Sequence, residues 1–403
     1  MQAKARLKVC SGHPGYSPGP ARVYHPRQLA LFTSTPDPIP IGIHWEPDEG
    51  EEVIIDEGLS MIKNKNSSQL LISGFGVFLE QENERLIVSR EGKTVYKFPL
   101  HHMNEVIISS RGISISSGLI ADLCQRGIRL SLLSSTGRPL AMITSPLLTS
   151  TTLIRREQIL AFQDQRGVEV SKAILSGKFH NQEKLVLLFH KSLKQKDPQR
   201  AEKIQEAARS ITVLRGKVKK ITGESIDEIR AALLEVEEEG NRMYWEAVRK
   251  IIDRKFEFLG RVHQQAAEAI RSMLNYGYGL LYSQIWGAVL QAGLEPFAGF
   301  LHVDQPGRSS LVLDLAEEFG QPVVDLPIIS QVNLGEINRV HNGLLDPETR
   351  ESIGQKILER LGSTQISEDR EYQIRSIIQI QARHLASFLR GEEGKYKPFR
   401  FKW

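Results

Sequence analysis

The apolar residues of this chain change their spacing once, near residue 150. Residues 67–150 hold short β-rich runs such as "LLISGFGVFLEQ" and "NERLIVSR", separated by turns that contain glycine or asparagine. From about Leu153 onward, the apolar residues recur at the helical spacing of three and four. This change predicts an α+β chain of two domains: a small N-terminal β domain over 67–150, followed by a larger all-α domain over 151–403.

Two segments stand outside that simple division. A short helix is expected from Ser117 to Gln125, between strands of the β domain. Residues 1–66 hold 8 of the 18 prolines and no periodic apolar face. We therefore expect residues 1–66 to be a poorly ordered, proline-rich extension.

Composition indicates where such a chain works. At 403 residues and 40% hydrophobic content, the chain can bury substantial cores. It contains no run of about 18 apolar residues and no apolar N-terminal segment, so we expect a cytoplasmic protein with no membrane contact. Cys10 and Cys124 are too few for a disulfide framework or a thiolate zinc site, and we expect inert thiols.

Charge is divided unevenly along the helical part. Residues 155–220 hold 16 Lys and Arg against 7 Asp and Glu, whereas residues 221–245 hold 2 against 7. A basic helical face is most often solvated surface. The alternative is neutralisation of DNA phosphates, which requires many cations on one side of the protein. The candidates for DNA contact are Arg155, Arg156, Lys172, Lys178, Lys217, Lys219 and Lys220.

The acidic segment contains a candidate ligand. "SIDEIRAALLEVEEE" begins with the pattern of a capping box, Ser225 with Glu228, and has one apolar face. Gly240 is expected to interrupt this helix before "NRMYWEAVRKII" resumes it. Glu239 would then lie at a junction between two helical segments, which suits a metal ligand better than the middle of a solvated helix face does.

A further helix, "NYGYGLLYSQIWGAVLQAGLEP", should end at Gly293 and Pro296, which are C-terminal stop signals. Its tyrosines Tyr276, Tyr278 and Tyr282 recur at helical spacing. Packing in the core is the commoner role for such residues. Contact with DNA by Tyr276 and Tyr282 is the alternative.

The next stretch, "GFLHVDQPGRSSLVLDLAEEFGQP", ends an apolar run at His302 and then turns into a helix that Ser309 can cap. Asp314, Glu317 and Glu318 fall on the side of this helix opposite its apolar residues. Spacing alone leaves two readings open, a metal site and a buried histidine beside a solvated helix. It also does not choose between Glu317 and Glu318.

Several longer segments together resemble a known family over roughly residues 68–403. The most specific is "NYGYGLLYSQIWGAVLQAGLEPFAGFLHVDQPGRSSLVLDLAEEF", supported by "LSGKFHNQ", "EEEGNRMYW" and the ending "FLRGEEGKYKPFRFKW". In the β domain, "FPLHHMNEVIISSRGISIS" and "CQRGIRLSLLSSTGRPLA" also match. In this order, the segments resemble the CRISPR-associated integrase family, the catalytic endonuclease subunit of spacer acquisition.

The resemblance implies a divalent metal held by Glu239, His302 and Glu317, with Asp314 in a supporting role and Glu318 as ordinary surface. Two carboxylates and an imidazole suit Mg²⁺ or Mn²⁺, and the absence of a His-Glu-x-x-His motif argues against a zinc protease. Such a metal can polarise a phosphodiester that a DNA 3′-hydroxyl or water attacks.

The resemblance also implies the function and the partners. The chain would be a metal-dependent DNA endonuclease and integrase that inserts short foreign DNA into a CRISPR repeat array. Its partners would be double-stranded DNA, both prespacer and repeat, a second copy joined through the β domain, and a small ferredoxin-like subunit in a heterohexamer. The alternatives are a catalytically inactive DNA-binding subunit that holds DNA for a partner, and a helical structural protein with surface carboxylates.

The sequence departs from the family pattern at two places in the helical part. An Asp-Pro-x-x-Asn pattern is missing before the tyrosine-rich helix, where this chain has "QQAAEAIRSMLNYGYG". After Phe319, a common Arg-Pro is replaced by Gly320 and Gln321. Neither departure removes a proposed metal ligand.

Overall fold

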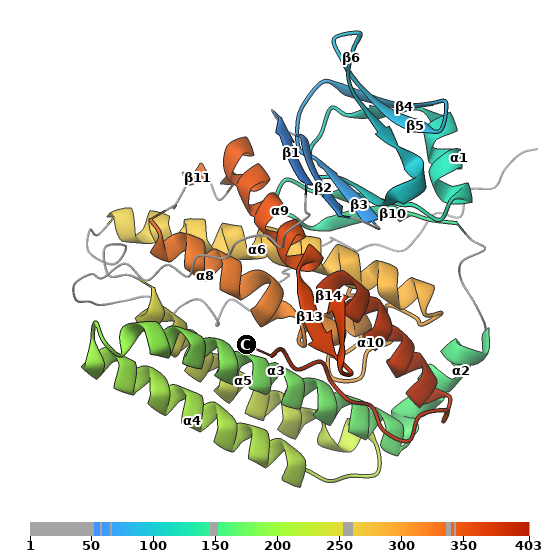
Figure 1. The fold of residues 1–403 in the computed structure, drawn as a ribbon. Coiled ribbons are helices and arrows are strands. Elements are labelled where there is room, and N and C mark those ends of the chain that lie inside the picture. The colour runs from blue at the N-terminus through green and yellow to red at the C-terminus, as the bar shows by residue number, and fades with distance from the viewer. Residues whose placement is uncertain are drawn as a thin grey trace, which may run out of the picture.

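The computed structural model describes residues 52–56, 59–64, 67–145, 152–252, 261–335, 340–341 and 344–402. Figure 1 shows a sheet-rich N-terminal part that sits on a larger assembly of helices. The predicted α+β class and the order of the two parts are confirmed. No helix of the described residues is long and apolar enough to cross a membrane.

The β domain contains two sheets. The six-stranded sheet has the order β1-β2-β3-β7-β9-β10, in which β3, β7 and β9 run parallel and the outer pairs are antiparallel. Its strands are β1 (Glu52–Asp56), β2 (Leu59–Asn64), β3 (Ser67–Ile72), β7 (Met103–Ile108), β9 (Arg129–Leu133) and β10 (Pro139–Ile143). The four-stranded sheet has the order β6 (Lys93–Pro99), β5 (Arg85–Arg90), β4 (Val77–Glu82) and β8 (Ser114–Ile115).

A hydrophobic core joins these two sheets to helix α1 (Ser117–Gln125). Leu70 and Val106 of the larger sheet, Leu79 and Val88 of the smaller one, and Leu119 of α1 belong to one cluster, each with 0% exposure. Alternating strand residues supply this core because successive side chains point to opposite faces of a sheet. The helix expected at Ser117–Gln125 is confirmed, and a 3-10 turn, η2 (Leu100–His102), precedes β7.

The β structure begins earlier than the sequence predicts. Strands β1 and β2 lie within the segment expected to be a proline-rich extension, and β2 pairs with β3 from Leu59–Ile72 to Asn64–Ser67. The eight prolines of residues 1–66 all precede Glu52, so proline content does not bear on residues 52–64. The expectation for residues 1–51 lies outside the described residues.

The helical part contains the long helices α3 (Gln165–Leu193), α4 (Pro198–Lys220), α5 (Ile226–Ile251) and α6 (Arg261–Gln291), of which α3, α4 and α5 pack together. Figure 1 shows α3 and α4 side by side at the far end from the β domain. The shorter helices are α2 (Thr152–Leu160), α7 (Ser310–Ala316), α8 (Leu326–Asn333), α9 (Pro347–Gly362) and α10 (Ile374–Leu389).

The remaining elements are short. A 3-10 turn, η4 (Ala161–Gln163), follows α2, and one turn of π-helix, η6 (Gln321–Asp325), precedes α8. Two small hairpins pair β11 (Val340–His341) with β12 (Leu344–Leu345), and β13 (Thr364–Ser367) with β14 (Arg370–Gln373). Helix α6 ends at Gln291, and Gly293 follows with a φ of 77°, which confirms the predicted stop.

Helix α5 does not break at Gly240. The helix is continuous from Ile226 to Ile251, so the predicted junction at Glu239 is wrong. A Cβ at residue 240 would lie 2.3 Å from Cε1 of Phe179, which shows that the glycine allows α3 to approach α5 closely. The predicted capping box is not formed either, because Glu228 accepts from the backbone N–H of Glu224 at 2.9 Å and Ser225 makes no side-chain cap.

Helix α6 is fixed against the β domain by a buried polar network. Gln69 donates to Glu105 Oε2 at 3.0 Å and to Gln284 Oε1 at 3.1 Å, and Ser131 donates to Glu105 Oε1 at 2.7 Å. Arg129 pairs with the same carboxylate at 3.4 Å. Buried polar groups that are mutually satisfied rigidify an interface, so this network sets where the later turns of α6 stand.

Candidate metal centre

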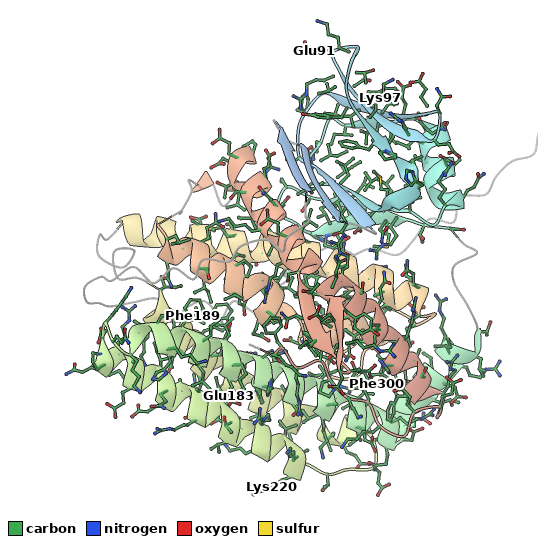
Figure 2. All side chains as sticks on the ribbon, viewed as in Figure 1. Glu91, Lys97, Glu183, Phe189, Lys220 and Phe300 are labelled. Carbon is green, nitrogen blue, oxygen red and sulfur yellow. The ribbon has the colours of Figure 1, made fainter. Side chains whose placement is uncertain are left out.

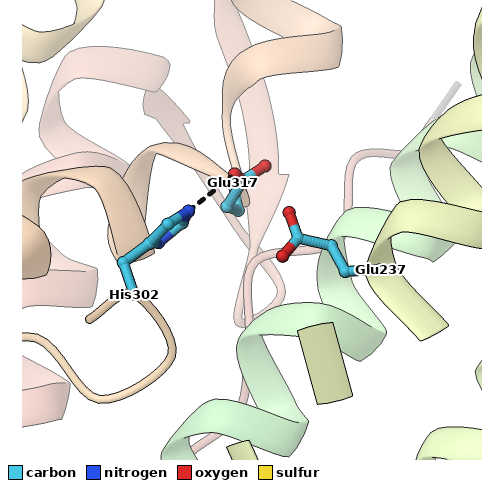
Figure 3. Close-up of side chains that lie close together, drawn as sticks. All are labelled: Glu237, His302 and Glu317. Atoms are coloured by element: carbon cyan, nitrogen blue, oxygen red, sulfur yellow. Dashed lines mark ion pairs between the residues drawn. The ribbon is translucent and has the colours of Figure 1, made fainter. Parts of the chain in front are cut away.

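Two carboxylates and one imidazole from distant parts of the chain converge in the helical part. Glu237 comes from α5, His302 from the loop between α6 and α7, and Glu317 from the end of α7. Each offers one ligand atom, and these atoms all lie within 4.8 Å of one another. Figure 3 shows the three side chains pointing toward a common space. Of the described residues, only these form such a group of three or more.

Asp314 orients His302. Its carboxylate is fully buried and accepts from His302 Nδ1 at 2.7 Å, and also from the backbone N–H groups of Phe300, Leu301 and His302. Because an ionised carboxylate can only accept, His302 carries a proton on Nδ1, and Nε2 faces Glu317 Oε1 at 3.8 Å. The carboxylate of Asp314 therefore fixes both the backbone of the loop before α7 and the orientation of the His302 imidazole.

Lys178 holds the two acidic residues. Its Nζ lies 2.7 Å from Glu237 Oε1 and 2.7 Å from Glu317 Oε2, and the lysine is only 4% exposed. Asn241 also donates to Glu237 Oε1, at 3.4 Å. Among the described residues, Glu237 Oε2 accepts no hydrogen bond. Each carboxylate thus has one oxygen held by Lys178 and a second oxygen that is not.

The same contacts determine the charge states. Burial alone would raise the pKa of Glu237, but the charges of Lys178 and His302 outweigh it and lower that pKa. Burial lowers the pKa of His302, whereas the hydrogen bond and charge of Asp314, with the charges of Glu237 and Glu317, raise it overall. The free oxygen of Glu237 is therefore charged at neutral pH, as a ligand for a hard cation should be.

The structure places Glu237, rather than Glu239, in this group. Two residues along a helix are about 200° apart. Glu239 also lines the cavity that contains this group, but its carboxylate pairs with Lys217 of α4 at 3.1 Å. The sequence contained a signal for Glu237, since Ile229, Leu233 and Glu237 follow each other at intervals of four residues on the buried face of α5. The candidate ligand set is therefore Glu237, His302 and Glu317.

Glu318 is not surface, contrary to the sequence-based expectation. It is fully buried and accepts from Tyr396 Oη at 2.7 Å, from the backbone N–H of Phe399 at 2.6 Å and from Gln381 at 3.0 Å. Burial raises its pKa to about 7 although these hydrogen bonds lower it. Glu318 therefore fixes the C-terminal segment against α7, directly behind Glu317.

The candidate DNA-contact residues divide into three groups. Lys178 is in the centre just described, and Lys172 donates to the carbonyl groups of Lys219 and Ile221 at the end of α4. Arg155 lies 3.8 Å from Glu295, and Lys217 pairs with Glu239. Arg156, Lys219 and Lys220 are exposed, and Figure 2 shows Lys220 at the outer end of α4.

The tyrosines of α6 also divide. Tyr276 is fully buried within the core cluster, so it has the packing role that the sequence analysis favoured. Tyr278 and the half-buried Tyr282 line a cavity of about 690 Å³ that also contains the three candidate ligands. Sequence reasoning did not identify three further residues of that cavity, Tyr244, Gln321 and Asp325, because polar and aromatic residues at these spacings are common in helices.

Comparison with known proteins gives the family. A model described as "CRISPR associated protein Cas1" matches residues 70–359. The CRISPR-associated endonuclease Cas1 1 of Archaeoglobus fulgidus is 34% identical over 347 residues, which cover 83% of this chain and 100% of that protein.

Solved structures have the same fold. A casposase bound to its integration product superposes with a TM-score of 0.65 at 25% identity, covering 80% of this chain and 90% of that one. A chain of a complex named Cas6-RT-Cas1–Cas2 gives a TM-score of 0.65 at 19% identity, covering 84% of this chain and 36% of that one. With the family model spanning most of the sequence, this chain belongs to the Cas1 family of CRISPR-associated proteins.

Proposed function

We propose that this chain is a metal-dependent DNA endonuclease and integrase, which inserts short foreign DNA into a CRISPR repeat array. The observation that carries the proposal is the convergence of Glu237, His302 and Glu317 within 4.8 Å. Membership of the Cas1 family, whose relative in Archaeoglobus fulgidus is named an endonuclease, supports it.

The donor set fits Mg²⁺ or Mn²⁺. Glu237 and Glu317 would each supply an oxygen that Lys178 does not hold, and His302 would supply Nε2 because Asp314 occupies Nδ1. When bound, such an ion would polarise a phosphodiester and stabilise charge on the attacking and leaving oxygens. Asp314 keeps the imidazole in place, and Lys178 keeps the two carboxylates together.

The attacking group comes from the substrate or from water in this proposal. A DNA 3′-hydroxyl would give strand transfer, and water would give simple cleavage. The protein's part is to position the phosphodiester beside the three ligands and to offset its charge with Lys178. No covalent intermediate on the protein is required.

DNA binding is proposed to use the exposed cations of the helical part, with Lys219 and Lys220 at the end of α4 as the clearest candidates. Replacing both by glutamate should weaken DNA binding and reduce its salt dependence, by about one unit of slope per lost phosphate contact. Lys172 is unsuited to this test because its ammonium holds backbone carbonyl groups. A salt titration with an unchanged slope would remove these two lysines from the DNA surface.

For assembly, we propose a homodimer joined through the β domains, and a heterohexamer with a small ferredoxin-like subunit. Two-fold symmetry would present paired sites to the two ends of one DNA. A chain of the same fold was solved in a complex named Cas6-RT-Cas1–Cas2, which supports assembly with a second CRISPR-associated protein. Light scattering at micromolar concentration should give the mass of a dimer, and a monomer would contradict the dimer.

The test of the function compares the wild-type chain with His302→Ala on branched DNA and on a plasmid that contains repeats. The wild type should cleave and join DNA only with Mg²⁺ or Mn²⁺, and the variant should lose both reactions yet still retard DNA in a gel. Cleavage by the variant at the wild-type rate would refute the proposal. Retardation without any cleavage by the wild type would instead support the alternative, a subunit that only holds DNA.

A further inference from the structure

The segment that follows α10 packs against the residues next to the metal centre. Residues 395–402, which we call the strap, have no regular secondary structure, yet Tyr396, Phe399 and Phe401 are only 1%, 5% and 4% exposed. Figure 1 shows this coil in dark red as it runs along α3. Among the described residues that line the cavity of the three candidate ligands, none belongs to the strap. The strap therefore reaches the metal centre from outside the cavity.

Asn181 of α3 joins the strap to the end of α7. Its amide nitrogen donates to the carbonyl oxygen of Glu318 at 2.8 Å and to that of Phe399 at 3.3 Å. Its Oδ1 accepts from the backbone N–H of Phe401 at 2.9 Å. One buried side chain thus holds α3, the end of α7 and the strap at fixed distances from one another.

The strap also contacts the two side chains that follow Glu317. Glu318 accepts from Tyr396 Oη at 2.7 Å and from the backbone N–H of Phe399 at 2.6 Å. The ring of Phe399 stacks on that of Phe319, with their centroids 4.8 Å apart. Because Glu317 directly precedes these two residues, the position of its backbone depends on the docked strap.

Helix α3 contacts the strap beside Lys178, the residue that holds Glu317. A Cβ at residue 177 would lie 2.8 Å from Cβ of Pro398, so Gly177 allows the strap to approach the helix closely. Nζ of Lys178, the next residue, lies 2.7 Å from Glu317 Oε2. The strap therefore packs beside both members of this ion pair, the lysine on α3 and the glutamate on α7.

These contacts define a geometry as well as burying apolar surface. Aromatic rings alone can bury a segment in several arrangements, whereas buried hydrogen bonds that are mutually satisfied select one of them. Residues that hold a metal ligand from behind commonly change the affinity for the metal although they do not touch it. The strap has this relation to Glu317.

We propose that the strap is a positioning element of the metal centre: when docked through Asn181 and Glu318, it holds Glu317 at the place where a divalent ion is bound. This inference rests on the proposed function, since it takes Glu237, His302 and Glu317 as metal ligands. Two binding events that share one arrangement strengthen each other by the same factor. Metal binding should therefore favour the docked strap as much as the docked strap favours metal binding.

The first test measures the effect of Mn²⁺ on cleavage of the wild-type strap by trypsin. Lys395 is exposed at the start of the strap, but cleavage after it requires the strap to detach. Saturating Mn²⁺ should slow this cleavage about 10- to 100-fold, the usual range for a residue that supports a metal ligand. Cleavage after Lys97, in strand β6 of the β domain, is the internal control and should change little. Equal rates at Lys395 with and without Mn²⁺, or equal slowing at both lysines, would overturn the inference.

The second test measures the affinity of strap variants for Mn²⁺ by titration calorimetry. Phe399→Ala should bind Mn²⁺ about 10- to 100-fold more weakly than the wild type. Phe98→Ala is the matched control, because Phe98 is also 5% exposed but belongs to the core of the β domain, and it should keep the wild-type affinity. The same affinity for Mn²⁺ in the two variants would contradict a positioning role of the strap.

Gly177→Ala keeps this test usable if Phe399→Ala folds poorly. It leaves every side chain of the strap in place and only pushes Pro398 away from α3. It should also weaken Mn²⁺ binding and speed cleavage after Lys395, whereas Gly216→Ala, an alanine in open space on α4, should do neither. Unchanged affinity and unchanged cleavage in Gly177→Ala would overturn the inference.

These results are separate from the test of the proposed function, because neither experiment contains DNA. A wild type that binds Mn²⁺ without any protection of Lys395 would remove only the positioning role of the strap. A wild type that binds no Mn²⁺ and cleaves DNA without it would remove the proposed function, on which the inference rests.

Discussion

Nδ1 of His302 lies 2.7 Å from Oδ1 of Asp314, and the same carboxylate accepts from three successive backbone N–H groups that end at His302. The orientation of the imidazole and the path of the loop that carries it thus depend on one buried side chain. Partners of this kind affect a metal site although they do not touch the metal.

The first prediction is that Asp314→Ala lowers the affinity for Mn²⁺ about 10- to 100-fold, the usual effect of removing a carboxylate behind a histidine ligand. The variant also leaves three buried N–H groups without an acceptor. Isothermal titration with Mn²⁺ measures the affinity. Asp304→Ala is the control, since Asp304 is exposed and accepts only from Ser310, and equal affinities in the two variants would contradict the role of Asp314.

The second prediction concerns Lys178. Replacing it with methionine removes the cation between Glu237 and Glu317, so their charges repel and the metal-free protein should lose about 3–5 kcal/mol of unfolding free energy. Mn²⁺ should restore part of this loss because it attracts the same carboxylates. Thermal unfolding in chelator and in Mn²⁺ measures both effects. Lys184→Met removes a half-exposed lysine from Glu183, and it should change little because Arg215 still pairs with that carboxylate at 3.0 Å. A Lys178→Met protein as stable as this control would refute the prediction.

A third prediction tests why Gly240 is in the middle of α5. Alanine is the better helix former by about 1 kcal/mol, but its Cβ would collide with the ring of Phe179. Gly240→Ala should therefore destabilise the protein by about 1–3 kcal/mol. Gly216→Ala in α4, where no atom lies within 4 Å of the new Cβ, should be neutral or stabilising in the same urea unfolding experiment. If both substitutions stabilise the protein, the close contact between α5 at Gly240 and Phe179 of α3 does not require a glycine.

The fourth prediction is a pH dependence. Burial raises the pKa of Asp325 from 3.8 to about 7, even though Tyr244 and Tyr278 donate to it. The pKa of Asp325 is higher in the folded protein than in the unfolded chain. At pH values between these two pKa values, the folded state therefore binds more protons than the unfolded state does. The stability that this proton confers is present below about pH 4 and is lost as pH rises through 7, by about 4 kcal/mol in all.

Asp325→Asn removes this titration and keeps a similar shape. Relative to the wild type, the variant should therefore gain unfolding free energy as pH rises from 4 to 7. Urea unfolding at a series of pH values measures the difference. If wild type and variant differ by the same amount at every pH, the carboxylate of Asp325 does not titrate in this range.

Local signals predicted several parts of the fold and of the site well. The change of apolar period gave the α+β order, helix α1 has the expected ends, and Gly293 ends α6 as expected. Family resemblance brought His302 and Glu317 together although nothing local does so. These features could be predicted because they depend on short-range patterns or on long motifs that can be recognised in the sequence.

Other parts depend on contacts that no local pattern contains. Gly240 looks like a helix break until Phe179 of α3 is seen against it. The junction expected there supported Glu239 as a ligand, whereas the continuous helix brings Glu237 into the group. Lys178 looks like one more surface cation because its two carboxylate partners come from α5 and α7. Glu318 was expected at the surface because the C-terminal segment that covers it lies about 80 residues away in sequence.

The most direct test of the proposal that Glu237 is the metal ligand from α5 compares Glu237→Gln with Glu239→Gln, two equivalent changes on one helix. Mn²⁺ binding by titration calorimetry and Mn²⁺-dependent cleavage of branched DNA are measured for both. Glu237→Gln should abolish both, because it removes a charged ligand oxygen, whereas Glu239→Gln should keep both, since it only weakens an exposed pair with Lys217. Loss of metal binding and cleavage in Glu239→Gln, with both retained in Glu237→Gln, would contradict the metal centre proposed for this protein.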